Sequence, residues 1–415
     1  MLGCTRRVSS YRLAAVLVAA LAAIALAACG GSSDGDETTK QGSAGIKQAS
    51  DESTGDLDWP LFGRIKTRTH YLRGKDLDPP LKEVWAYQEG VLIEYPPALQ
   101  DGVLYLADKA GDVRAIRASS GDTIWHIAGA GGANGAPDDT TGPAYFHGRV
   151  FVAMQRGEVF ALDPQTGKEQ WRRRLPTQLE SSPLVIRSTV YLGSDKGVVY
   201  ALDVRNGKIR WQYKASDAPV KTSPAYAAGR IYFADYSGVV HAIDANTGKK
   251  VWQTDTDGKA GGSGGFYSSP ALGAGKLFIG RDDGGFFALD QGSGKILWSK
   301  QTGKPIIGSP AVAKVPKTPL SVYIGNSAGT LYAFEAAGGH QRWRYEVGGP
   351  IPGTPTVIGK TVYTSSFRTQ EAVGVEAKTG KKVFRFAAPG YTPMISDGER
   401  LYLVGYESLR ALEPG

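Results

Sequence analysis

The chain repeats one short pattern at intervals of 40–46 residues, and this periodicity restricts the possible folds more than any other feature. Successive copies end on an aromatic residue, and the spacings between these residues are 46, 40, 41, 46, 45 and 41. Repeats of this length without helical periodicity are typical of β-propeller blades. The clearest copies are ALDPQTGKEQW (161–171), ALDVRNGKIRW (201–211), AIDANTGKKVW (242–252) and ALDQGSGKILW (288–298).

Each repeat holds four short apolar runs separated by turn residues, as in SSPLVI, TVYLGSD, VVYALD and KIRWQYK between residues 181 and 214. The D-x-x-T-G-K turn before the last run suits a hairpin, because the Asp accepts backbone N–H bonds and the Gly adopts a positive φ. The Trp that follows lies on the outermost strand, where its ring can pack on the next blade. We therefore interpret the tryptophans as structural docking residues: Trp85, Trp125, Trp171, Trp211, Trp252, Trp298 and Trp343.

The number of blades follows from counting third strands. There are eight, and the last, SLRALEPG (408–415), has no outer strand after it. Upstream, KEVWAYQ (82–88) has the outer-strand pattern but no blade before it, and its Trp85 precedes Trp125 by 40 residues. The sequence thus predicts an all-β fold, an eight-bladed propeller of four-stranded antiparallel blades. An N-terminal strand completes the last blade and protects its edge.

The N-terminus predicts export. Arg6, Arg7 and Arg12 precede an apolar run that ends Leu26-Ala27-Ala28-Cys29-Gly30. This run is short for a membrane span and typical of a secretory signal. Its end resembles a lipobox, which implies that Cys29 is acylated; an ordinary cleaved signal with a chance cysteine is the alternative. The expected domains are a lipoprotein signal peptide (1–28), a disordered tether (29–57) and the propeller (58–415). The expected location is the outer face of the cell membrane, or the outer membrane and periplasm in a diderm.

The charge of the predicted body is positive. The whole chain has a net charge of +8, residues 1–28 hold three arginines and no acid, and residues 30–58 hold seven acids against two lysines. Residues 59–415 therefore carry +10. Such a body can attract anionic lipid, acidic polymers or acidic protein faces. Because the basic residues are scattered along the sequence, we interpret them as solubilising charge. No nucleic-acid partner is expected.

The repeats resemble the tryptophan-docking repeat of pyrroloquinoline-quinone (PQQ) propellers, and DWPLFGRIKTRTHY (58–71) resembles the segment that often precedes the first blade in that group. Within the group, a lipoprotein made only of a propeller is similar to the BamB family. This resemblance implies a non-enzymatic scaffold that binds a protein of the cell envelope. A PQQ-dependent dehydrogenase, or a degenerate relative of one, is the alternative. Against it, the folded part has no cysteine, whereas the resemblance implies adjacent cysteines in the enzymes.

No motif in the chain predicts catalysis. None of the five histidines has metal-ligand spacing, the glycine runs lie between strands, and the Asp pairs do not continue as calcium loops. We therefore expect a monomer with no catalytic, cofactor or metal site.

Two long connections, 129–142 and 257–266, lie between blades and predict a partner-binding face. Candidate contacts there are Asp138, Asp139, Phe266 and Tyr267; the alternative is mobile loops that touch nothing.

Overall fold

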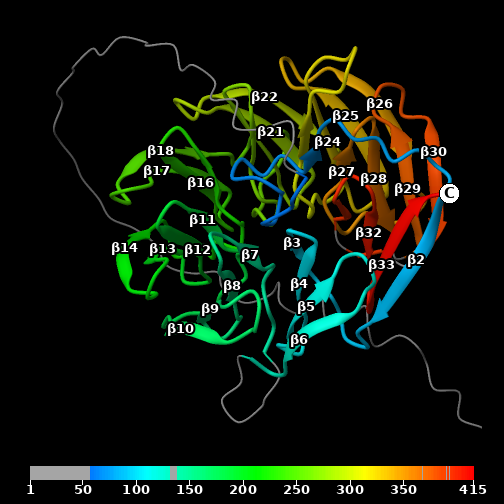
Figure 1. The fold of residues 1–415 in the computed structure, drawn as a ribbon. Coiled ribbons are helices and arrows are strands. Elements are labelled where there is room, and N and C mark those ends of the chain that lie inside the picture. The colour runs from blue at the N-terminus through cyan, green and yellow to red at the C-terminus, as the bar shows by residue number, and fades with distance from the viewer. Residues whose placement is uncertain (1–56, 131–137, 367, 389, 392) are drawn as a thin grey trace, which may run out of the picture. The chain divides into compact units, whose positions relative to one another are not determined.

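A computed structural model of the chain describes residues 57–130, 138–366, 368–388, 390–391 and 393–415. All of these residues belong to one compact unit, Gln48–Gly415. They form strands and turns without a helix, so none of the described segments is a helix able to span a bilayer. The strands make eight sheets, seven of four strands and one of five, arranged as the blades of a ring (Figure 1). The predicted eight-bladed propeller is confirmed.

Burial explains why each blade needs its sequence pattern. The second and third strands pack against neighbouring blades on both sides, and β12 (Thr189–Gly193) is buried at all five positions. The outermost strand has one free edge, and β14 (Ile209–Lys214) alternates between exposed and half-buried residues. Runs of Val, Tyr, Leu and Ala therefore occupy the inner positions, and charged residues occur on the outer strand.

The first four blades follow one another along the chain, each running from the innermost strand to the outermost. Their strands are β3 (Ala98–Gln100), β4 (Val103–Ala107), β5 (Val113–Arg117) and β6 (Thr123–Ile127); β7 (Ala144–Tyr145), β8 (Val150–Ala153), β9 (Glu158–Leu162) and β10 (Glu169–Arg174); β11 (Leu184–Ile186), β12, β13 (Val198–Asp203) and β14; and β15 (Ala225–Ala227), β16 (Arg230–Ala234), β17 (Val239–Asp244) and β18 (Lys250–Asp255).

The remaining blades repeat this order, and two of them also take up strands from the N-terminal part. Their strands are β19 (Ala271–Gly273), β20 (Lys276–Gly280), β21 (Gly285–Asp290) and β22 (Ile296–Gln301); β23 (Ala311–Ala313), β24 (Ser321–Gly325), β25 (Thr330–Glu335) and β26 (Gln341–Glu346); β27 (Thr356–Ile358), β28 (Thr361–Ser366), β29 (Glu371–Glu376) and β30 (Lys382–Ala387), with β1 (Tyr71–Leu72); and β31 (Ile395–Ser396), β32 (Leu401–Val404) and β33 (Ser408–Pro414), with β2 (Leu81–Gln88).

Blade eight joins the two ends of the ring. Strand β2 pairs antiparallel with β33, from Leu81 opposite Pro414 to Gln88 opposite Ser408. Figure 1 shows the blue β2 beside the red β33. The predicted closing strand, 82–88, is confirmed and begins one residue earlier. Backbone hydrogen bonds between distant parts of the chain therefore close the ring.

The seven tryptophans of the outer strands contact the next blade in the same way. Each indole N–H donates to a backbone carbonyl in the turn between the third and fourth strands of the following blade. For Trp171 the acceptor is the Val204 oxygen at 2.8 Å. The ring covers the glycine of that turn: a Cβ on Gly207 would lie 2.6 Å from the Trp171 ring, and its φ is +66°. Glycine is therefore required there for both space and backbone conformation.

Phe384 occupies the corresponding position in blade seven, beside the closing blade. In blade eight, two separate chain segments, β33 and β2, replace the usual turn. Phe384 instead lines a hollow of about 340 Å³ together with Pro79, Pro80 and Leu81. Phenylalanine adds apolar surface at this position without an N–H group that needs a hydrogen-bond partner.

A chain of side-chain hydrogen bonds also links the blades near the ring's centre. The residue before the proline of each inner strand donates its backbone N–H to the hydroxyl of the equivalent residue in the next blade. Five successive bonds, between 2.8 and 3.1 Å, connect blades two to seven. The residues are Gly142, Ser182, Ser223, Ser269, Ser309 and Thr354.

Residues 59–72, here called the central segment, lie inside the ring, where Figure 1 shows them in blue. The sequence had suggested only that this stretch precedes the first blade. Its backbone bonds to the inner strands of six blades, through Leu99, Tyr145, Tyr226, Leu272, Val312 and Val357. The sequence signal was missed because the segment's partners are spread over more than 250 residues of chain.

Candidate partner-binding face

The ring has two faces that differ in their connections. The tight-turn face carries the turns between first and second strands and between third and fourth strands. The long-loop face carries the turns between second and third strands and the connections from one blade to the next. The four predicted contact residues belong to blade-to-blade connections on the long-loop face.

Asp138 and Asp139 are held by different partners. Asp139 lies 2.7 Å from the Lys109 ammonium and remains partly exposed. Asp138 is buried, and its carboxylate accepts the backbone N–H of Arg156 at 3.2 Å. Burial raises the pKa of Asp138 more than these contacts lower it. Of the two, only Asp139 therefore has exposed surface that a partner could contact. Residues 131–137 of the same connection lie outside the described residues.

Phe266 and Tyr267 point to different environments. Phe266 is fully buried in the core, with its ring 6.3 Å from that of Phe287, so it has no exposed surface for a partner. Tyr267 is half-buried, meets Tyr236 edge to face at 5.0 Å, and has the Lys221 ammonium 5.3 Å from its ring centre. The sequence could not separate the two neighbours, because both are aromatic and follow the same glycine run.

Arg281 holds the connection around residues 257–266 in place. Its buried guanidinium donates to the backbone oxygens of Thr256 at 2.6 Å, Lys259 at 3.1 Å and Gly262 at 2.5 Å. It also pairs with Asp283 at 2.6 Å. The described residues of this glycine-rich connection therefore have a defined shape. No motif in the sequence indicates this role, because the partners of the guanidinium in the connection are backbone oxygens.

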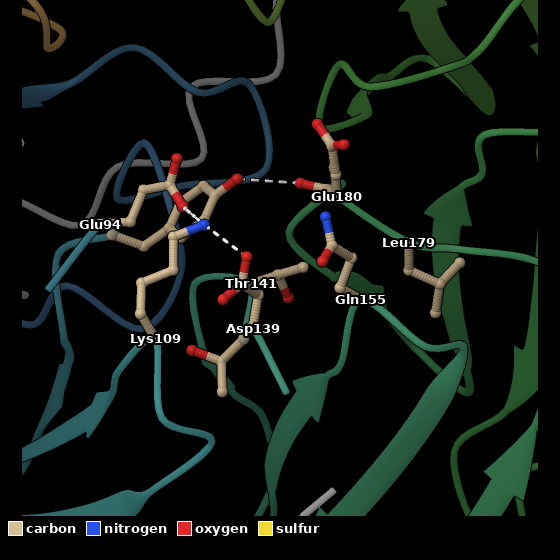
Figure 2. Close-up of a pocket in the computed structure, with 9 residues that line it drawn as sticks. Glu94, Lys109, Asp139, Thr141, Gln155, Leu179 and Glu180 are labelled. Carbon is tan, nitrogen blue, oxygen red and sulfur yellow. Dashed lines mark hydrogen bonds and ion pairs between the residues drawn. The ribbon is translucent and has the colours of Figure 1, made fainter. Parts of the chain in front are cut away.

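A polar cleft of about 120 Å³ opens on the same face, between blades one, two and three (Figure 2). Figure 2 shows Lys109 between Glu94 and Asp139, at 2.5 and 2.7 Å. Although burial opposes the charged form, the two carboxylates raise the pKa of Lys109. The remaining lining residues, which the sequence did not single out, are Tyr95, Thr140, Thr141, Gln155, Leu179 and Glu180.

Three carboxylates converge next to this cleft, those of Glu89, Asp108 and Asp112. Arg114 pairs with all three, at 3.2 Å from Asp108 and 2.9 Å from Asp112. Burial, with the neighbouring Asp108, raises the pKa of Glu89 to about 8. Because a guanidinium already supplies the positive charge, this donor set does not fit a calcium ion, which favours six to eight oxygen ligands.

The centre of the ring is filled by side chains of the central segment. Trp59, Arg68 and His70 have no exposed surface. The Arg68 guanidinium donates to the backbone oxygens of Phe62, Pro224 and Ser182. Burial lowers the pKa of Arg68 to about 9 and, with Arg68 nearby, that of His70 to about 3. The polar cleft, at about 120 Å³, is smaller than the pockets of roughly 300–1,000 Å³ that organic cofactors occupy.

A family model described as outer membrane protein assembly factor BamB matches residues 109–254 and 216–413 of this chain. The chain belongs to this family. BamB from Moraxella catarrhalis shares the fold, with a TM-score of 0.66 and 20% identity over 80% of this chain and 99% of that one.

Curated relatives of this BamB-family chain include both assembly factors and enzymes. Outer membrane protein assembly factor BamB of Escherichia coli is 32% identical over 93 residues, which are 21% of this chain and 24% of that protein. A quinohemoprotein alcohol dehydrogenase of Comamonas testosteroni is 31% identical over 125 residues, 28% of this chain and 18% of the enzyme. The matches thus span about a quarter or less of these relatives, which leaves their activities and partners open for this chain.

Proposed function

We propose that this protein is a non-enzymatic scaffold of the cell envelope, anchored by lipid at Cys29, that binds a protein partner on its long-loop face. The observation that carries the proposal is the construction of that face. Tyr267 lies in the connection that Arg281 holds and packs on Tyr236, and Lys109 forms an ion pair with Glu94 on the same face. The centre of the ring, by contrast, is occupied by the chain itself.

The half-buried charged pairs of this face suit a partner with mixed charges. Lys109 is shared between Glu94 and Asp139, and Lys221 between Glu180 and the ring of Tyr267. Charged groups at an interface increase the rate of association and the selectivity for a partner more than they increase affinity. Tyrosine adds apolar contact area at a small cost in side-chain entropy.

Site-specific crosslinking tests the choice of face. The only cysteines are Cys4 and Cys29, so a single cysteine can be introduced anywhere in the ring. Tyr267→Cys should capture one defined envelope protein, and Asn206→Cys on the tight-turn face should not. Capture should disappear when Glu94→Lys and Glu180→Lys are added, with an unchanged melting temperature. Capture from Asn206→Cys alone would contradict the proposal.

The anchor has its own test. Cys29→Ser should remove the protein from the fraction that resists high-salt washing, because acyl chains are the only strong hydrophobic anchor the proposal provides. Retention of the variant in washed membranes would show that acylation of Cys29 is not what holds the protein there.

A PQQ-dependent dehydrogenase is the second candidate, favoured by the similarity to the Comamonas enzyme. Purified protein should be mixed with PQQ and calcium and followed for quinone absorbance and dye reduction with alcohols or sugars. We expect neither stoichiometric binding nor turnover. Observing both would replace the scaffold proposal with an enzyme.

A further inference from the structure

The two faces of the ring carry opposite charge. Counted over the turns with one strand residue on each side, the tight-turn face has 18 Lys and Arg against 11 Asp and Glu. Counted in the same way, the long-loop face has 10 against 18. The segment 73–80, which contacts the tight-turn face, adds two of each sign. Of the two faces, the tight-turn face is therefore cationic and the long-loop face anionic.

One position of the repeat accounts for much of this asymmetry. A lysine follows the turn glycine in five blades, and each is exposed and forms no ion pair with a described residue. The turn acids, in contrast, accept backbone N–H bonds, as Asp244 does from Thr247 at 2.8 Å. The turns thus hold their acids against the backbone and present their lysines to solvent. These lysines are Lys168, Lys208, Lys249, Lys295 and Lys381.

The N-terminal part of the chain joins the ring at this same face. The Asp58 carboxylate accepts from the Gln100 side chain at 2.6 Å and from the Asp101 backbone at 3.1 Å, in the first turn of blade one. Leu57 lies against Gly398, in the corresponding turn of blade eight. Leu57 and Asp58, the first described residues of the chain, therefore lie at the cationic face.

We propose that the tight-turn face docks on a bilayer surface with anionic headgroups, so that the long-loop face points away from the membrane. This orientation rests on the lipid anchor proposed above. The 27 residues between Cys29 and Leu57 make 28 Cα–Cα steps and can reach at most about 95 Å, so an anchor alone would leave either face free to turn toward the lipid. The opposite charges of the two faces determine which face turns toward the anionic lipid.

The interaction is electrostatic and short in range. Each Lys or Arg close to an anionic leaflet strengthens binding about five-fold, and the effect falls off within about 8 Å at physiological salt. The acidic segment 30–58, with a net charge of −5, weakens the attraction. It does not reverse it, because the excess of cations on the face is larger. Two signals, acyl chains and a basic surface, together give stable membrane association.

Fluorescent probes on single cysteines test the orientation in the full-length lipidated protein. Asn246→Cys places a probe on the tight-turn face and Asp217→Cys on the long-loop face; both residues are exposed. A headgroup quencher should quench the Asn246 probe on phosphatidylglycerol vesicles, much less on phosphatidylcholine vesicles, and not at high salt. The Asp217 probe should stay unquenched throughout.

Replacing lysines of the tight-turn face by glutamine tests the strength of vesicle binding quantitatively. Lys249→Gln with Lys381→Gln should weaken binding to phosphatidylglycerol vesicles about 25-fold at low salt. The matched control, Lys259→Gln with Lys304→Gln on the long-loop face, should change it less than about two-fold.

Three results would overturn the orientation: quenching of the Asp217 probe, equal quenching on both lipids, or equal loss in both double variants. Crosslinking of the Asn246 position to an acidic protein instead of lipid would also overturn it. Flotation with vesicles at high salt reports only on the acyl anchor. Loss of flotation would contradict acylation of Cys29. Quenching of the probes at low salt would still show which face lies against the bilayer.

Discussion

The two faces of the ring show how one repeat serves two purposes. The tight-turn face repeats nearly the same D-x-x-T-G-K hairpin from blade to blade. Every outer-strand tryptophan docks on the turn between the third and fourth strands of the next blade. The long-loop face varies in length and charge, and the polar cleft and the pinned connection near Arg281 lie there. Repetition therefore accompanies inter-blade packing, and variation accompanies the features that a partner could recognise.

The ring itself is what both faces share, and opening it should have the largest effect. A truncated protein lacking residues 58–88 loses the central segment and the strand that pairs with β33. We expect no cooperative unfolding transition by calorimetry or circular dichroism. A truncated protein that melts sharply at the original temperature would show that neither face depends on closure.

Arg281 tests whether the long-loop face is as firmly built as the tight-turn face. Arg281→Ala leaves the oxygens of Thr256, Lys259 and Gly262 and the Asp283 carboxylate without their donor. The free energy of unfolding should fall by about 3 kcal/mol, measured by urea denaturation. Arg205→Ala removes an exposed ion pair on the opposite face and should leave the midpoint unchanged. Equal midpoints for the two variants would mean that the connection is not pinned.

Glycines of the tight-turn face separate packing from backbone conformation. At Gly207 an added Cβ meets the Trp171 ring at 2.6 Å, whereas at Gly229 nothing lies within 4 Å, and both have positive φ. Gly229→Ala should cost about 1 kcal/mol of unfolding free energy and Gly207→Ala about 2–3 kcal/mol. If the two substitutions cost the same, the docked tryptophan contributes no constraint beyond φ.

Two acids of the tight-turn face, Asp163 and Asp244, and one of the long-loop face, Glu89, should respond to pH in opposite directions. On the tight-turn face, side-chain hydrogen bonds with Thr166 and Thr247 lower the pKa of Asp163 and Asp244. The folded state releases these protons more readily than the unfolded chain, so this contribution is present above the ordinary aspartate pKa and lost as pH falls below it.

For Glu89, on the long-loop face, the pH dependence of stability has the opposite sign. Glu89, with its pKa raised to about 8, holds its proton more tightly when folded, so stability should decline as pH rises from about 4.5 to about 8. Glu89→Gln should remove that decline, a change of about 2 °C in Tm between pH 5 and pH 9. A variant with the pH profile of the original protein would mean that Glu89 is ionised throughout this range.

The candidate site was only partly accessible from the sequence. Loop length directed attention to Tyr267 and Asp139, which lie on the long-loop face. It did not show that the adjacent Phe266 is buried against Phe287. Glu94, Lys109 and Glu180 carry no motif, and they meet only because three different blades bring them together.

What the sequence determined by itself is the repeating unit: four strands, a glycine turn, a docking aromatic residue, eight copies and an extra strand at the front. These features depend on hydrogen bonds and packing within about 45 residues, so local composition encodes them. Only the tertiary structure decided that residues 59–72 fill the centre of the ring and that Arg281 binds backbone oxygens of the connection around residues 257–266. It also separated the scattered charges into two faces. The physical reason is that closing a ring places equivalent positions of every repeat on one surface. A lysine repeated about every 40 residues becomes part of a charged face only after closure.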